Sequence, residues 1–95
     1  MPKGYIVSRV EIKNPKAYAK YAEAATKVIA AHGGKALARG GRFEELEGQA
    51  RARNVVLEFE SFDAAQSYYY SPEYQAAKAL REGAAEMEMV LVEGA

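Results

Sequence analysis

The sequence predicts an α+β fold in which a four-stranded antiparallel sheet carries helices on one of its faces. Three observations lead to this prediction. Stretches rich in β-branched and aromatic residues alternate with alanine-rich stretches in the order β-α-β-β-α-β. Proline and glycine stand at the borders between these stretches. A split β-α-β order of this kind places the first and third strands in the centre of the sheet.

A strand is expected over residues 5–12 and a helix over residues 15–32. Apolar side chains alternate along the first segment and recur at helical spacing along the second, so each segment has one side that faces a core. Asn14 can cap the helix, and Pro15 fits its first turn. Gly33 then ends the helix, because glycine adopts the left-handed conformation of a helix C-cap at little cost.

The middle of the chain predicts two more strands. The second strand is expected from residue 35 to about residue 47, with a bulge or bend at Gly40-Gly41. A polar turn then leads into a third strand over residues 54–61, which alternates well. Asp63 and Gln66 resemble a capping box, which predicts that a short helix follows.

The second helical unit is predicted to be broken in two. The short helix is expected to run through about Tyr70, and Ser71 can then cap a new helix in which Pro72 occupies the first turn. This helix is expected to end near Gly83. Alternating residues 86–91 predict the final strand.

The sheet face opposite the helices is predicted to be apolar and open. An uncovered apolar face of this size is typical of an interface. We therefore expect a homodimer in which two copies pack sheet against sheet. The side chains expected on this face are Tyr5, Val7, Val56, Val90 and Val92.

Composition narrows the class of protein. The 95 residues are expected to form a single domain over residues 1–95. The 13 basic side chains balance 13 acidic ones, and this balance argues against nucleic-acid binding. The chain has no cysteine and no apolar stretch of about 20 residues, so we expect a cytoplasmic protein that does not cross a membrane. Its one histidine has no partner at metal-ligand spacing, and no dinucleotide fingerprint is present, so no metal and no cofactor are expected.

His32 is the candidate acid or base, since the pKa of histidine lies near neutrality. The structural alternative is a side chain that interacts with the last carbonyl groups of the helix and with its dipole. We favour this alternative, because no Ser or Cys nucleophile motif accompanies His32.

Charged strand residues are the candidate ligand contacts. Arg9, Arg39, Glu58 and Glu88 form an alternating charged row if the strand registers agree. Such a row either fixes the register through ion pairs, which we favour, or forms a polar site in which Arg39 grips an anionic ligand.

The tyrosines of residues 67–74 cannot all face one direction on a helix. One or two should pack on the sheet, while another presents its hydroxyl group to solvent or to a cleft. Core packing is the favoured reading, and an aromatic pocket wall that contains Tyr69 and Tyr74 is the alternative.

Several short motifs follow one another in a specific order along nearly the whole chain. They are Tyr18-x-x-Tyr21, His32-Gly33-Gly34, Arg39-Gly40-Gly41, Glu47-Gly48, Val55-Val56-Leu57-Glu58-Phe59, Ser71-Pro72-Glu73-Tyr74 and Arg81. Together they resemble the domain of unknown function 1330 family. The resemblance implies a ferredoxin-like fold of the dimeric α/β-barrel group, whose relatives at fold level include cofactor-independent monooxygenases. It implies no established reaction.

The leading hypothesis is a small homodimeric protein that binds, or binds and transforms, a small organic molecule. The site is expected in a pocket between helices and sheet or in a dimer cavity. The rival hypothesis is a non-catalytic dimerisation or interaction module. The residues that would carry the site are His32 as acid or base, and Arg39, Glu58, Tyr69 and Tyr74 as ligand contacts.

Overall fold

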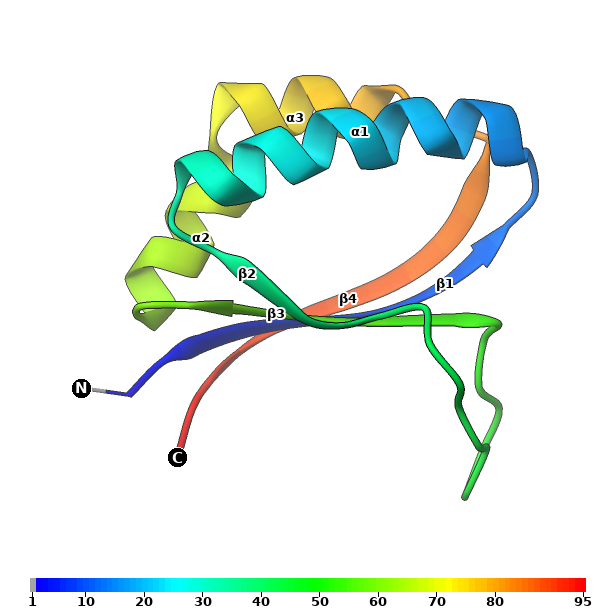
Figure 1. Cartoon of the computed structure of the whole chain (residues 1–95), viewed down its shortest axis with the longest axis horizontal. Coiled ribbons are helices and arrows are strands. Elements are labelled where there is room, and N and C mark those ends of the chain that lie inside the picture. The colour runs from blue at the N-terminus through cyan, green and yellow to red at the C-terminus, as the bar shows by residue number, and fades with distance from the viewer. Residues whose placement is uncertain (1) are drawn as a thin grey trace.

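Three helices cover one face of a four-stranded antiparallel sheet in the computed structural model, which describes residues 2–95 (Figure 1). The strands lie in the order β2-β3-β1-β4, so the first and third strands are central, as predicted. The ferredoxin-like topology is therefore confirmed. The elements are β1 (Gly4–Ile12), α1 (Pro15–Ala31), β2 (Lys35–Arg39), β3 (Arg53–Phe59), α2 (Phe62–Tyr70), α3 (Pro72–Ala79) and β4 (Ala85–Glu93).

The core lies between the three helices and the helix-facing side of the sheet. Apolar residues of α1 recur at helical spacing and are buried, as the sequence predicts. The strands supply every second residue, and Ile6 of β1 lies between Leu57 of β3 and Leu91 of β4. Helix α1 ends as expected, since Gly33 has a φ of 74°. This layered arrangement is what forms a space between helices and sheet.

Serine side chains begin both short helices: Ser61 precedes α2, and Ser71 forms the corner between α2 and α3. The Ser71 hydroxyl accepts a hydrogen bond from the Tyr74 amide at 3.1 Å and donates one to the Tyr68 carbonyl at 2.8 Å, so the predicted cap at Ser71 is confirmed. The predicted capping box at Asp63 is wrong. Ser61 caps α2 instead, because its extended backbone places its hydroxyl 3.0 Å from the Ala64 amide.

The predicted second strand is wrong beyond Arg39. Gly40 has a φ of 73°, and after its amide bonds to the Asn54 carbonyl at 2.9 Å the chain leaves the sheet. Residues 40–49 are exposed and form no strand, since no neighbouring strand pairs with them. In Figure 1 this projecting segment extends below the sheet, on the side away from the helices. Helix α3 also ends earlier than predicted, at Ala79.

The outer face of the sheet has an apolar half, as expected. Val7 of β1 lies between Val56 of β3 and Val90 of β4. Val90 and Val92 are 57% and 47% exposed, and nothing in residues 2–95 covers them. None of the helices in residues 2–95 is long and apolar enough to span a membrane.

The outer face also has a charged half, next to the projecting segment. Arg51 contacts Glu11, Glu86 and Glu88 at 3.1–3.3 Å, and Arg9 contacts Glu88 at 3.1 Å. These ion pairs act as cross-strand links between β1 and β4, and they join both strands to Arg51, which follows the projecting segment.

Candidate functional site

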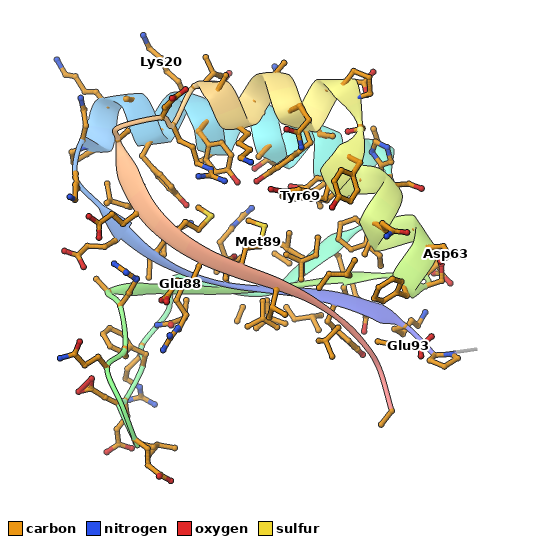
Figure 2. All side chains as sticks on the ribbon, turned by 180° about the vertical axis from the view of Figure 1, so that it is seen from behind. Lys20, Asp63, Tyr69, Glu88, Met89 and Glu93 are labelled. Atoms are coloured by element: carbon orange, nitrogen blue, oxygen red, sulfur yellow. The ribbon has the colours of Figure 1, made fainter. Side chains whose placement is uncertain are left out.

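The space between the helices and the sheet contains two pockets, which together form the candidate site. The larger one, here called the β4-side pocket, has a volume of about 270 Å³. The smaller one, here called the arginine pocket, has a volume of about 50 Å³. Within residues 2–95, Met89 is the one side chain that lines both. Figure 2 shows Met89 and Tyr69 in the space between β4 and the helices.

The β4-side pocket lies between α2 and the edge strand β4. Its floor is apolar, because alternate residues of β4 and of the neighbouring strand β1 point toward the helices. Its wall is formed by aromatic and amide side chains of α2. The lining residues are Ile6, Gln66, Tyr69, Tyr70, Met89 and Leu91.

The ring of Tyr69 is held in position by its neighbours. It packs on Tyr74 with 5.2 Å between ring centroids and stands perpendicular to Tyr70 at 5.1 Å. Lys78 donates a hydrogen bond of 3.0 Å to the Tyr69 hydroxyl oxygen. Since a phenol oxygen that accepts a bond keeps its own proton, Tyr69 can still donate a hydrogen bond to a ligand.

Two buried tyrosines and an arginine lie next to this wall. The hydroxyl groups of Tyr21 and Tyr74 are 2.9 Å apart, and the Arg81 guanidinium lies 5.1 Å from the ring centroid of Tyr21. Burial raises the pKa of the Tyr21 phenol far above its ordinary value, so it is neutral at physiological pH. Burial acts against the charge of Arg81, but the phenol oxygens of Tyr74 and Tyr21 outweigh it and raise the pKa of Arg81.

The arginine pocket lies between α1 and the helix-facing side of the sheet, on the other side of Met89 from the β4-side pocket. Arg53 of β3 enters it from the sheet, with its guanidinium 5.7 Å from the ring centroid of Tyr18. Arg39 of β2 lines it as well, together with Ser8 and Thr26. The residues that line this pocket include no aspartate and no glutamate. It is therefore a small cationic pocket with otherwise neutral walls.

Arg39 does not join the expected charged row. In the register between β2 and β3 it lies opposite Val55, which faces the helices, because the pairing shifts by one residue in the middle of β2. Arg9 and Glu88 are paired on the outer face, where they form the expected cross-strand ion pair. The helix-facing position of Arg39 is what places it in the arginine pocket.

Glu58 and His32 lie outside both pockets. Glu58 is on the outer face, where it accepts a hydrogen bond from the Tyr5 hydroxyl at 3.2 Å and pairs with Lys35 at 3.7 Å. The Nδ1 atom of His32 is 3.0 Å from the Val28 carbonyl oxygen in the last turn of α1. This is the interaction that the structural alternative for His32 describes.

The five sequence candidates therefore do not gather around one cavity. Tyr69 lines the β4-side pocket, Arg39 lines the arginine pocket, and Tyr74 is buried in contact with Tyr69. In the part of the chain that the structure describes, no three or more metal-ligating side chains cluster as around a metal ion.

Sequence reasoning missed Arg53 and Met89 as site residues. A signal for Arg53 was present, because it stands two residues before Val55 and four before Leu57, which are both buried. Period-two alternation extended by one step places Arg53 on the helix-facing side. The alternation of residues 86–91 separates Met89 from Val90, but nothing local in the sequence indicates that Met89 lies between two pockets.

Comparison with known proteins decides the family. A model of the family described as Domain of unknown function (DUF1330) matches residues 3–95. The chain belongs to the DUF1330 family. No curated protein matches this DUF1330 chain significantly.

Solved structures share the fold of this DUF1330 protein at low sequence identity. A protein of unknown function from Rhodopseudomonas palustris has a TM-score of 0.78 at 19% identity, covering 99% of this chain and 83% of its own. A dimeric ferredoxin-like protein of unknown function from Thermobifida fusca has a TM-score of 0.66 at 17% identity, covering 97% and 91%. SnoaB, a cofactor-independent oxygenase from Streptomyces nogalater, has a TM-score of 0.62 at 13% identity, covering 97% and 92%.

Proposed function

We propose that this DUF1330 protein is a homodimer that binds a small organic molecule in the β4-side pocket. The observation that carries the proposal is a pocket of about 270 Å³ with an apolar floor and an aromatic wall. Pockets for drug-sized ligands begin at about 300 Å³ and have mostly apolar walls with a few polar groups. The ligand is accordingly a compact molecule with an apolar or aromatic body.

The polar groups of the pocket favour a ligand that carries a hydrogen-bond acceptor. Lys78 already donates to the oxygen of Tyr69, so the Tyr69 proton is directed to another acceptor. Gln66 adds an amide at the rim. A carbonyl group on a small ring compound satisfies both. The fold is similar to that of a cofactor-independent oxygenase, and this analogy is the reason to test whether the ligand is also turned over.

The homodimer is supported by the open outer face. A second copy packed sheet to sheet covers Val90 and Val92, which the chain itself leaves exposed. Two structural neighbours, from Thermobifida fusca and Bacteroides fragilis, are described as dimeric. Light scattering should give about twice the monomer mass of 10.4 kDa, and a clean monomer at micromolar concentration contradicts this part of the proposal.

The ligand proposal is tested by a thermal-shift screen of small ring compounds with carbonyl groups, followed by two variants. Binding to the native state raises the melting temperature. Tyr69→Phe keeps the ring but removes the donor, and should weaken a hit by about tenfold. Leu91→Trp fills the pocket and should abolish the shift. Tyr5→Phe is the matched control on the outer face and should bind as wild type.

Two outcomes contradict the ligand proposal. One is a screen in which no compound stabilises the protein, and the other is a hit whose shift survives Leu91→Trp. A hit that is also consumed, with product detected by mass spectrometry, would establish turnover.

The cytoplasmic location and the absence of nucleic-acid binding expected from the sequence stay predictions.

A second candidate function, a non-catalytic interaction module, is favoured by the projecting segment. Phe43 and Leu46 of this segment are 50% and 84% exposed. Large apolar side chains exposed this far are typical of a surface that contacts another chain. If this candidate holds, Leu46→Ser should lower the apparent mass in light scattering, while Leu91→Trp should leave that mass unchanged.

A further inference from the structure

We propose that the arginine pocket binds the carboxylate group of a small organic acid, with Arg53 as the central contact and Arg39 at the rim. This site lies on the other side of Met89 from the β4-side pocket and does not depend on it.

The guanidinium of Arg53 has a defined position. The ring of Tyr18 lies on one side of it, with the centroid 5.7 Å from Cζ. The backbone of Gly40 lies against another side, so that a Cβ atom at this position would overlap Nη1 of Arg53. Since Gly40 also has a φ of 73°, only glycine fits here without strain. The guanidinium of Arg53 therefore lies next to both the Tyr18 ring and the Gly40 backbone.

No acidic group compensates the charge of Arg53. The Nε atom is buried and has no hydrogen-bond partner within the described residues. The ion pairs of residues 2–95 include Arg9 and Arg51, each with glutamate partners, but neither Arg53 nor Arg39. A partly buried charge without a partner is costly, and an anion that binds it removes this cost.

The shape and chemistry of the pocket select a carboxylate. The guanidinium fork donates two parallel hydrogen bonds that match a planar carboxylate. A volume of about 50 Å³ accepts a group of that size but no larger body. Tyr18 and Met87 provide apolar walls for the start of a hydrocarbon or ring. Phosphate sites typically add free backbone amides of a helix N-terminus, whereas the residues of α1 that line this pocket begin at Tyr18, whose amide already donates to the Asn14 carbonyl at 2.9 Å.

The test is a titration of the whole protein, followed by NMR and calorimetry, with three probes. Benzoate carries the carboxylate, benzamide is its neutral counterpart, and inorganic phosphate is a compact anion. Benzoate should shift the Nε–H signal of Arg53 and the amide signal of Gly40 in a saturable way. Benzamide and phosphate should leave both signals unchanged.

Variants then locate the site. Arg53→Gln should weaken benzoate binding by at least about tenfold, and Arg39→Gln by about threefold, as expected for a charged contact in a pocket and one at its rim. Lys20→Gln removes the same charge from the outward side of α1, where Figure 2 shows Lys20 pointing to solvent, and should bind as wild type. If Arg53→Gln does not fold, Arg53→Lys keeps the charge, loses the planar fork and should still weaken binding.

Four results overturn the proposal. The first three are no saturable benzoate response in the wild type, a response to phosphate alone, and benzoate binding that neither Arg53→Lys nor Arg39→Gln weakens. The fourth is benzoate binding that Leu91→Trp abolishes and Arg53→Gln leaves intact, because such binding belongs to the β4-side pocket. Failure of the arginine site is in this way distinguished from failure of the proposed function.

Discussion

The two faces of the sheet cover their apolar residues in different ways. On the helix-facing side, Tyr68 and Tyr74 are 2% and 0% exposed; they pack on each other, and Tyr68 also packs on Phe59. On the outer side, Val90 and Val92 remain about half exposed in the single chain. The first face is covered by helices of the same chain, whereas residues 2–95 leave the second face open, where the proposed dimer would cover it. Substitutions on the helix-facing side should therefore lower the stability of the fold. Substitutions on the outer side should weaken the association between two copies.

The largest effect is expected from Tyr74→Ala on the helix-facing side. Removing a fully buried aromatic ring leaves a cavity and should lower the free energy of unfolding by about 3–5 kcal/mol. Urea denaturation followed by circular dichroism measures it. Tyr70→Ala is the control, since Tyr70 is 69% exposed, and it should change stability by less than about 0.5 kcal/mol. Equal effects of the two variants would contradict the division between core and surface.

The outer face is tested by Val90→Glu. A charge placed without a partner in a sheet-to-sheet interface should weaken dimerisation by about 100-fold, while the fold is retained. Sedimentation or light scattering over a range of concentrations measures the change. Ala19→Glu adds the same charge at an exposed position of α1 and should leave the dimer intact. A dimer unaffected by Val90→Glu assembles through some other surface.

A smaller effect is expected at the corner between α2 and α3. Ser71→Ala removes the cap of α3 and the bond to the Tyr68 carbonyl, and should cost about 1 kcal/mol of unfolding free energy. Ser67→Ala is the control on the exposed side of α2 and should be close to neutral. If thermal unfolding shows the same melting temperature for both, Ser71 does not contribute as a cap.

The smallest effect concerns the charged half of the outer face. Hydrogen bonds from Lys13 hold the pKa of Glu86 below its usual range, and hydrogen bonds from Arg51 do the same for Glu88. Because the folded-state pKa values are lowered, this stabilisation is present above the ordinary carboxyl pKa and is lost as pH falls through the folded values. Arg51→Gln should flatten the dependence of melting temperature on pH below about 4.5. An unchanged slope would show that these exposed pairs contribute nothing to stability.

Much of the fold was predictable because its signals are local. Ser71, Pro72 and Gly33 act within one turn of the backbone, and the alternation in β1 and β3 reports which side is buried. The errors occurred where local signals compete. Ser61 and Asp63 are both good cap residues, and only the backbone conformation decides between them. Residues 40–47 have some strand character, but no strand is available to pair with them.

The candidate site was less predictable, because a pocket is a property of several elements together. Tyr69 and Arg39 were chosen by residue type and do line pockets, whereas Glu58 lies on the other face of the sheet. The position of Arg39 depends on a register shift inside β2, and such a shift moves a side chain to the opposite face. Arg53 becomes a site residue only because Gly40 and Tyr18, distant in sequence, lie on either side of it.

By itself, the sequence determined the order of elements, the division of β1, β3 and β4 into two faces, and the open apolar patch. It could do so because the spacing of apolar residues and the capping of helices act over a few neighbouring residues. The tertiary structure alone decided which side chains share a pocket. It placed Met89 between two cavities and left Arg53 without an acidic partner. These contacts join residues that are far apart in sequence. They are set by strand register and helix packing, which no local pattern in the sequence reports.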